Sequence, residues 1–278
     1  MVTTGSDISI VLSGGGDNLN PNLSLGGNPS ITPITNNTLD NLFDDVTSEQ
    51  NIDGVEDYRC VYFFNDGDTT IYSVKVFIFD DFEGGATMQT GIFQQDEIQR
   101  ILITGTPTGG SISISYDSST PTVINYNSDL SIMALEIQDT LNSLVDTNGE
   151  SILQDVSITA QPTGSNIIFD LLFGGRDGSR THPLLSVTNN LTPTVTTSVT
   201  KIRAGGPINT IASQLDVSTT PPGDVGFFQS SSQSPITVPK LRTSDGFPFW
   251  IQRVVPANTT AQANDGLTLR FQAESLET

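Results

Sequence analysis

The stretch YRCVYFFNDGDTTIYSVKVFIF, residues 58–79, decides the fold. Its two halves, 58–64 and 70–79, are rich in aromatic and β-branched residues, which favour strands. In the second half, alternate side chains from Tyr72 to Ile78 point to one face, as in a half-buried strand. The NDGD turn at 65–68 is typical of a β-hairpin loop. The stretch therefore predicts two antiparallel strands paired with each other.

Further strands are expected near both ends of the chain. Residues 7–12 alternate apolar and polar side chains, and 249–255 form an apolar run around Trp250. An Asn-Asp-Gly turn at 264–266 leads into the alternating strand 267–273. Joined together, the two ends hold about seven strands, the usual number for a sandwich. We therefore expect a mainly β protein whose antiparallel β-sandwich is discontinuous, built from residues 1–98 and 202–278.

The middle of the chain, residues 99–201, has a different pattern and predicts an inserted small α+β domain with one helix. Leu130, Met133, Ile137, Leu141 and Leu144 recur at helical spacing. The expected amino-terminal cap is Ser128 and the expected stop is Asn148-Gly149, while Glu136, Gln138, Asp139 and Asn142 should face water. Strands are expected at 101–104, 111–116, 122–126, 155–160, 166–173 and 184–188.

An extended arm at residues 13–40 is dominated by Gly, Pro and Asn, including three successive glycines at 14–16. Such a stretch has few regular ways to pair its own backbone, so we expect it to become ordered against adjacent subunits. Trp250 is expected at a core or interface position. Arg253 and Arg270 are expected on neighbouring strands, paired with carboxylates of the same domain or of another subunit. The interface candidates are Leu25, Pro29, Pro33, Leu42, Phe43, Trp250, Arg253 and Arg270.

Composition narrows the range of partners. Eleven Lys and Arg residues stand against 31 Asp and Glu residues, a formal net charge of −20. Such a surface repels phosphate backbones and anionic lipid, so neither nucleic acid nor membrane is an expected partner. No run of 18 apolar residues and no secretory signal is present, which predicts a protein made in a cytoplasm. The single cysteine excludes an intrachain disulfide.

Few residues are available for chemistry. His182, the only histidine, is expected in a turn at the surface, and Cys60 in the core of a strand. The acidic pairs at 44–45 and 80–81 resemble solvated loop edges, because adjacent strand residues point to opposite faces. The NDGD turn at 65–68 lacks the spacing of a calcium loop. We predict no catalytic, cofactor-binding or metal site, and hence a non-enzymatic protein.

Several motifs lie at the two ends of the chain: VLSGG at 11–15, NPN at 20–22, SLGG at 24–27, NLFDDV at 41–46, DYRC at 57–60, FWIQRVVPA at 249–257 and NDGLTLR at 264–270. Together they resemble a family of tailed-bacteriophage virion structural proteins. The resemblance covers about half of the chain, roughly residues 7–79 and 222–272. The middle resembles, more loosely, a separate domain of phage structural proteins, with the FGGRD turn at 173–177.

The resemblance implies a virion component of the tail, baseplate or neck, synthesised in the host cytoplasm and located in the particle. The implied partners are other virion proteins, including further copies of this chain in a homo-oligomer. Two alternatives stay open. The protein is a capsid decoration subunit in the first, and in the second the inserted domain binds a glycan or protein on the host surface.

Overall fold

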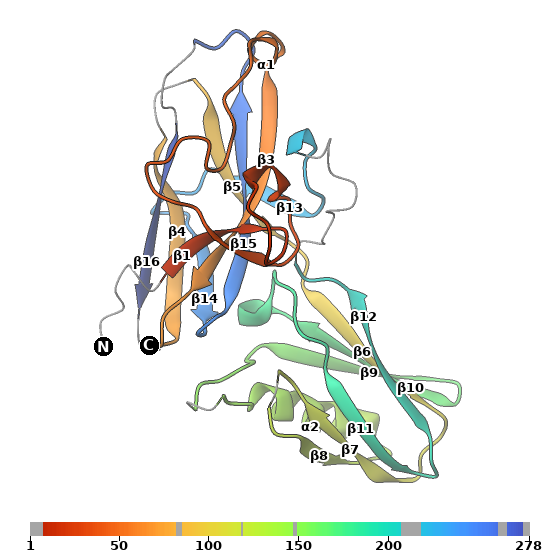
Figure 1. Cartoon of the computed structure of the whole chain (residues 1–278). Helices are drawn as coiled ribbons and strands as arrows, with labels where there is room; N and C mark the ends of the chain where they lie inside the picture. The colour runs from red at the N-terminus through yellow and green to blue at the C-terminus, as the bar shows by residue number, and fades with distance from the viewer. Residues whose placement is uncertain are drawn as a thin grey trace. The chain divides into compact units, whose positions relative to one another are not determined.

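The computed structural model describes residues 8–81, 85–117, 119–146, 149–206, 218–260 and 266–274 (Figure 1). The expected fold class is confirmed: the protein is mainly β, with several antiparallel sheets. The chain divides into two compact units. Residues 1–94 and 207–278 form the discontinuous unit, and residues 95–206 form the inserted unit. The sequence placed these boundaries at 98/99 and 201/202.

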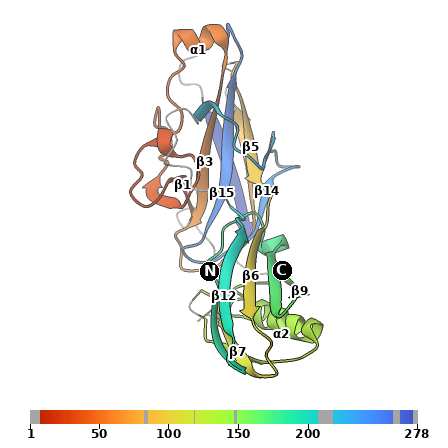
Figure 2. The same ribbon diagram turned by 90° about the vertical axis from the view of Figure 1, so that its right-hand side faces the viewer.

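The discontinuous unit is a sandwich of two antiparallel sheets (Figures 1 and 2). The six-stranded sheet has the order β13-β5-β15-β3-β1-β2, and the three-stranded sheet has the order β14-β4-β16. A shared core joins Val61 and Phe63 of the first sheet to Val74 and Val76 of the second. The strands are β1 (Ile8–Ser13), β2 (Pro29–Pro33), β3 (Val55–Asn65), β4 (Ile71–Asp81), β5 (Thr87–Phe93), β13 (Val225–Phe228), β14 (Ile236–Leu241), β15 (Gly246–Val255) and β16 (Leu267–Glu274).

The predicted hairpin between β3 and β4 is wrong, because the two strands lie in different sheets. β3 pairs with β1 and β15, whereas β4 pairs with β14 and β16. The turn between them carries the chain from one sheet to the other. Asn65 holds this turn: its side-chain amide donates to the carbonyls of Thr69 and Leu241 at 2.9 and 3.0 Å, and its Oδ1 accepts from the Gly67 amide.

An irregularity in β4 changes which side chains face the core. Ser73 has a φ of 52°, and the register against β16 shifts beside it. Ile71, Val74 and Val76 therefore all enter the same core, although strict alternation would place Ile71 on the opposite face.

The arm at residues 13–40 folds back on its own unit, so the expectation that it needs an adjacent subunit is wrong for residues 13–34. β2 pairs with β1, and the amides of Gly14 and Gly15 donate to the Asn28 carbonyl. Both glycines have positive φ, 104° and 95°, which lets the chain reverse there. Residues 35–40 are exposed.

A short helix, α1 (Ser48–Asp53), precedes β3. Thr47 caps its start, with Gln50 completing a capping box.

The inserted unit has two antiparallel sheets and the helix α2 (Leu130–Asn142). The sheets have the orders β12-β6-β10-β9 and β11-β7-β8, and α2 packs on β9 and β8. β12 was not predicted, because its exposed Thr, Ser and Lys residues give no apolar pattern. The strands are β6 (Glu97–Thr104), β7 (Gly109–Ser115), β8 (Thr122–Asn125), β9 (Val156–Thr163), β10 (Asn166–Phe173), β11 (Ser186–Thr192) and β12 (Thr196–Arg203).

The predicted apolar face of α2 is confirmed, because Met133, Ile137 and Leu141 are fully buried. The predicted cap is wrong: the side chain of Asp129, not Ser128, accepts from the Ser131 amide. The helix ends at Asn142, and Ser143 is its carboxyl-terminal cap, with a backbone N–H that donates to the Asp139 carbonyl. The expected stop at 148–149 falls later, and Asn148 lies outside the described residues.

Two side chains of α2 that were expected to face water bind the edge strand β9. Asn142 accepts from the Val156 amide and donates to the Val156 carbonyl, both at 3.0 Å. Gln138 accepts from the Ile158 amide at 3.1 Å. The helix thus satisfies backbone groups that would otherwise form an open sheet edge. Neither α1 nor α2, the α-helices of the described residues, is long and apolar enough to cross a membrane.

Candidate functional site

Motif residues from both ends of the chain meet around Phe43. Arg59 of β3 and Arg253 of β15 each place a guanidinium over the Phe43 ring, 5.1 and 4.8 Å from its centroid. The two strands are neighbours in the six-stranded sheet, and Asp57 lies directly opposite Arg253. We call Asn22, Phe43, Asp57, Arg59 and Arg253 the Phe43 cluster.

Arg59 is almost completely buried and joins three segments. Its Nε donates to the Leu42 carbonyl at 3.1 Å, its Nη1 to the Tyr58 carbonyl at 2.9 Å, and its Nη2 to Asn22 Oδ1. Burial lowers the pKa of Arg59, and the nearby Asp57 opposes this effect. Its hydrogen bonds therefore tie the arm and the segment before α1 to β3.

Arg253 completes the cluster from the far end of the chain. Its Nη2 lies 2.6 Å from Asp57 Oδ2, and its Nη1 donates to the Asp44 carbonyl at 2.8 Å. Asp44 in turn accepts from the Asn22 side-chain amide. The carboxylate partner of Arg253 thus lies within its own domain, one of the two predicted possibilities. The contacts are structural, because each guanidinium is engaged by groups of the same chain.

Arg270 does not belong to this cluster. β15 and β16 lie in different sheets, so the expected neighbouring placement of Arg253 and Arg270 is wrong. Arg270 is exposed and lies over the ring of Phe79, 4.8 Å from the centroid, and Phe79 is 59% exposed.

A second apolar cluster lies on the face of the six-stranded sheet that points away from the core between the two sheets. It contains Leu25, Tyr58, Cys60 and Trp250, with Phe227 packed against it. Burial raises the pKa of the Cys60 thiol to about 12, which keeps it protonated, and its predicted core position is confirmed. Trp250 also occupies a core position.

The interface candidates divide according to burial. Leu25, Leu42 and Trp250 are buried in their own unit, so a role for them at a surface is wrong. Pro29 and Pro33 begin and end the edge strand β2, and Pro33 is exposed. The motifs therefore contain more residues that are buried within the domain than residues that are exposed at its surface. Sequence similarity alone does not separate these two groups.

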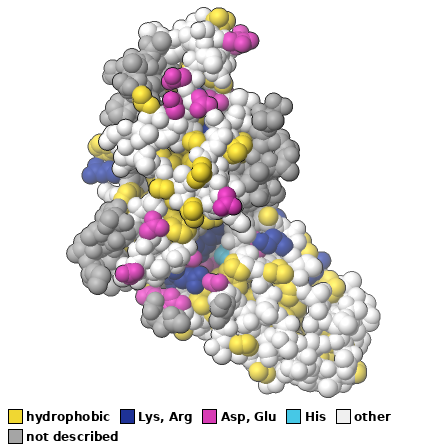
Figure 3. Space-filling model, viewed as in Figure 1, with side chains coloured by type: hydrophobic (Ala, Val, Ile, Leu, Met, Phe, Trp, Pro, Cys, Tyr) yellow, Lys and Arg dark blue, Asp and Glu magenta, His cyan; other side chains and the backbone are white. Residues whose placement is uncertain are grey.

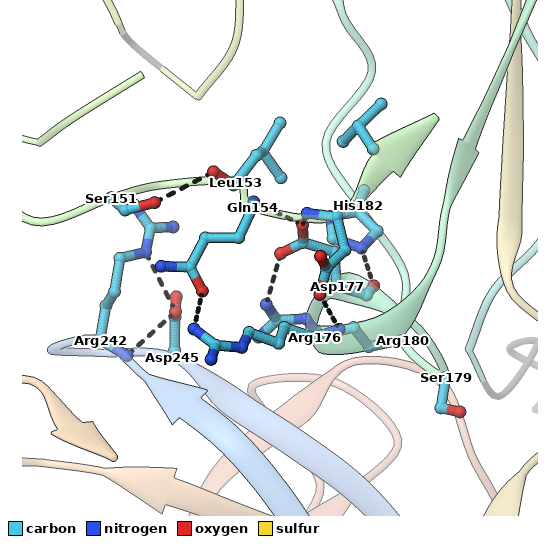
Figure 4. A network of polar contacts seen from close by, with 12 residues as sticks. Ser151, Leu153, Gln154, Arg176, Asp177, Ser179, Arg180, His182, Arg242 and Asp245 are labelled. Carbon is cyan, nitrogen blue, oxygen red and sulfur yellow. Dashed lines mark hydrogen bonds and ion pairs between the residues drawn. The ribbon is translucent and has the colours of Figure 1, made fainter. Parts of the chain in front are cut away.

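His182 is buried in the inserted unit, so its predicted surface position is wrong (Figure 4). Its Nε2 lies 2.6 Å from the Asp177 carbonyl and its Nδ1 lies 2.8 Å from the Tyr116 hydroxyl. A carbonyl only accepts, so Nε2 carries the proton and Nδ1 accepts from Tyr116. The ring also stacks on Phe173 at 4.3 Å. Burial, and then the charge of Arg180, lower the pKa of His182 to about 4.

Asp177 anchors the FGGRD segment from within the same network (Figure 4). Its Oδ2 accepts from the amides of Gln154 and Asp155, both at 2.8 Å. Arg176 donates to the Gln154 side chain at 2.7 Å. The motif thus fixes a loop between β10 and β11 by hydrogen bonds that its spacing in the sequence did not reveal.

A buried polar group on β6 and β12 was not predicted from the sequence. Glu97 and Gln99 are fully buried, and Lys201 Nζ lies 2.7 Å from Glu97 Oε2. Gln99 Nε2 donates to Glu97 Oε1 at 2.8 Å. The available signal was the alternation in β6, where Glu97 and Gln99 share the buried face with Ile101.

Other candidate ligands do not converge. The side chain of Asn65, in the NDGD turn, forms hydrogen bonds with backbone groups of Thr69 and Gly67. No group of three potential metal ligands occurs among the described residues. Asp44 and Asp45 are exposed, whereas the side chains of Asp80 and Asp81 lie outside the described part of the chain.

No protein-family model matches the chain, and no match was found among curated proteins or among solved structures.

Proposed function

We propose that the chain is a non-enzymatic structural component of a tailed-phage particle, associated with the tail, baseplate or neck. The observation that carries the proposal is the surface of the arm. The three most exposed large hydrophobic side chains among the described residues are Ile31, Leu19 and Leu39, at 80, 75 and 68%. All three lie within residues 13–40, next to motifs that resemble virion proteins.

Contacts with β3 and β15 hold the arm in place, while these three apolar side chains remain exposed. Leu25 is buried against β3 and β15, and Ser24 donates from its hydroxyl to the Cys60 carbonyl at 2.6 Å. Figure 3 shows apolar side chains together with acidic ones on the face of the discontinuous unit that it displays. Exposed apolar side chains on an arm that is already held against its own unit fit docking to a neighbouring subunit, since little ordering is required on binding.

The Phe43 cluster supports this role. It connects residues of the arm, of β3 and of β15 through hydrogen bonds and an ion pair, which tie the arm to the sandwich. We assign the partner as another virion protein, either a further copy of this chain or a different subunit.

Purified particles of the phage that encodes the chain provide the test. We expect the protein at about six or twelve copies per particle, the numbers that cyclic symmetry along a tail axis produces. Copy numbers on the order of hundreds would instead support the capsid decoration alternative. Absence of the protein from purified particles would overturn the proposal.

The surface itself is tested by a triple variant, Leu19→Ser, Ile31→Ser and Leu39→Ser. We expect it to fold normally and to be lost from particles, because the side chains contribute to docking and not to the core. Ile52→Ser is the matched control, since Ile52 is 63% exposed on α1 and lies outside the arm. Normal incorporation of the triple variant would remove the arm from the assembly mechanism.

A further inference from the structure

The first and last strands of the inserted unit bring an amine and a carboxamide together. β6 and β12 pair antiparallel, and Gln99 lies directly opposite Lys201. Directly opposed residues point to the same face, with Cβ atoms about 5 Å apart. Glu97 is two residues from Gln99 on the same strand and therefore shares that face.

One carboxylate contacts both groups. Glu97 Oε2 lies 2.7 Å from Lys201 Nζ, and Glu97 Oε1 accepts from Gln99 Nε2 at 2.8 Å. Glu97 and Gln99 are fully buried, while the Lys201 side chain is 32% exposed. The Lys201 amine and the Gln99 carboxamide are thus both directed at the same carboxylate.

The carboxamide is also held at both of its polar atoms. Its Oε1 accepts from the Leu185 amide at 2.9 Å, and its Nε2 donates to the Pro183 carbonyl at 2.8 Å. A backbone N–H at the carbonyl oxygen stabilises the negative charge that develops there when a nucleophile attacks the carbon. The arrangement thus contains a nucleophile, an acid–base group and an oxyanion donor.

We propose that Lys201 and Gln99 join in an intramolecular isopeptide bond, with Glu97 as the acid–base group. Glu97 takes a proton from the Lys201 ammonium, and the neutral Nζ attacks Gln99 Cδ. The new C–Nζ bond forms and the C–Nε2 bond breaks, while Glu97 returns protons to Nε2. One ammonium group is consumed and one ammonium ion is released, so nothing is oxidised and no co-reactant is needed.

The bond would close the inserted unit covalently between its first and last strands. A cross-link that spans about a hundred residues restricts the unfolded chain strongly. The inserted unit would then resist unfolding and would keep its two ends together under load. This role is independent of the position of the protein in a particle.

Intact-mass measurement of the full chain tests the proposal. After incubation at neutral pH, we expect a mass lower than that of the sequence by one ammonia, about 17 Da. Peptide mapping should recover a branched peptide that joins the segments around Gln99 and Lys201, and trypsin should no longer cleave after Lys201. Lys75→Arg is the matched control, because Lys75 is an exposed strand lysine, and this variant should keep the mass loss.

Two variants separate the reaction from the fold. Lys201→Arg retains a positive partner for Glu97 but removes the reactive amine, so it should have the full mass. Glu97→Gln should also have the full mass, because no group remains to take the proton. The full mass in the wild-type protein would overturn the proposal, as would a mass loss that maps to other residues. The branched peptide is read from the wild-type protein and does not depend on the folding of either variant.

Discussion

Asn65 and Leu241 lie 176 positions apart, yet the Asn65 side-chain amide donates to the Leu241 carbonyl at 3.0 Å. This hydrogen bond connects the end of β3 to the end of β14, and thereby one sheet of the sandwich to the other. The turn that looked like a local hairpin is instead fixed by a strand from the far end of the chain.

Replacing Asn65 should therefore destabilise the discontinuous unit. Asn65→Ala leaves the buried carbonyl of Leu241 and the part-buried carbonyl of Thr69 without their side-chain donor, so we expect a loss of about 1–3 kcal/mol in unfolding free energy. Denaturant unfolding of the full chain measures this change. Asp66→Ala, at an exposed position of the same turn, is the control and should change stability by no more than about 0.5 kcal/mol. Equal effects of the two variants would contradict the role of Asn65.

Arg253 and Arg270 offer a matched pair, because each places its guanidinium 4.8 Å from a phenylalanine centroid. Arg253→Met leaves the buried Asp57 carboxylate unpaired, which should cost about 3–5 kcal/mol. Among the described residues, Arg270→Met removes an exposed stacking contact with Phe79, worth about 0.5–1 kcal/mol. Thermal unfolding of both variants gives the comparison. A similar loss in each would show that the Asp57 contact contributes little.

The single histidine gives a direct measurement of pH dependence. Because burial lowers the pKa of His182 from 6.5 to about 4, the unfolded chain binds more protons than the folded chain between these values. The contribution of His182 to the unfolding free energy is therefore fully present above pH 6.5. It decreases as the pH drops toward 4, by up to about 3 kcal/mol.

Nuclear magnetic resonance of the one imidazole should give a pKa near 4 in the folded protein. Hydrogen exchange in the loop between β10 and β11 should accelerate as the pH falls through this window, after correction for intrinsic exchange. His182→Phe removes the titrating group and should flatten that dependence. An imidazole that titrates near 6.5 would contradict the buried, neutral state.

Asn142 of α2 should protect the edge of β9. Asn142→Ala frees the backbone amide and carbonyl of Val156, so we expect a loss of about 1–3 kcal/mol and a greater tendency to self-associate. Melting curves and light scattering read the two effects. Asp139→Ala, at an exposed position of the same helix, should change neither.

The inserted unit should be separable from the rest of the chain. A shortened protein in which a short flexible linker replaces residues 95–206 should still melt cooperatively, because the two parts of the discontinuous unit complete each other's sheets. Residues 95–206 expressed alone should fold as well. Loss of cooperative melting in the shortened protein would mean that the sandwich depends on the insertion.

Local pattern was sufficient for the elements whose burial follows a simple period. The strand at 166–173 coincides with β10, and the apolar face of α2 was identified from its spacing. Pattern failed where distant segments decide the outcome. The partners of β3 and β4 come from both ends of the chain, and β12 carries too few apolar residues to be recognised.

The candidate site shows the same division. Phe43 and Arg253 were singled out from motifs, but their contact spans 210 positions of sequence and no local rule brings them together. A surface position was predicted for His182 because Pro183 follows it in a polar segment. The side chain is instead buried, and its ring nitrogens form hydrogen bonds with Tyr116 and Asp177.

The place of β15 between β3 and β5 has a consequence for biosynthesis. A ribosome makes β3 and β5 first, then the whole inserted unit, and only afterwards β15. The inserted unit, whose strands are contiguous in the chain, is complete while β3 and β5 still lack the strand that joins them. Until residue 255 emerges, the nascent chain therefore carries unpaired strand edges, which makes this interval the one in which chaperones have most to protect.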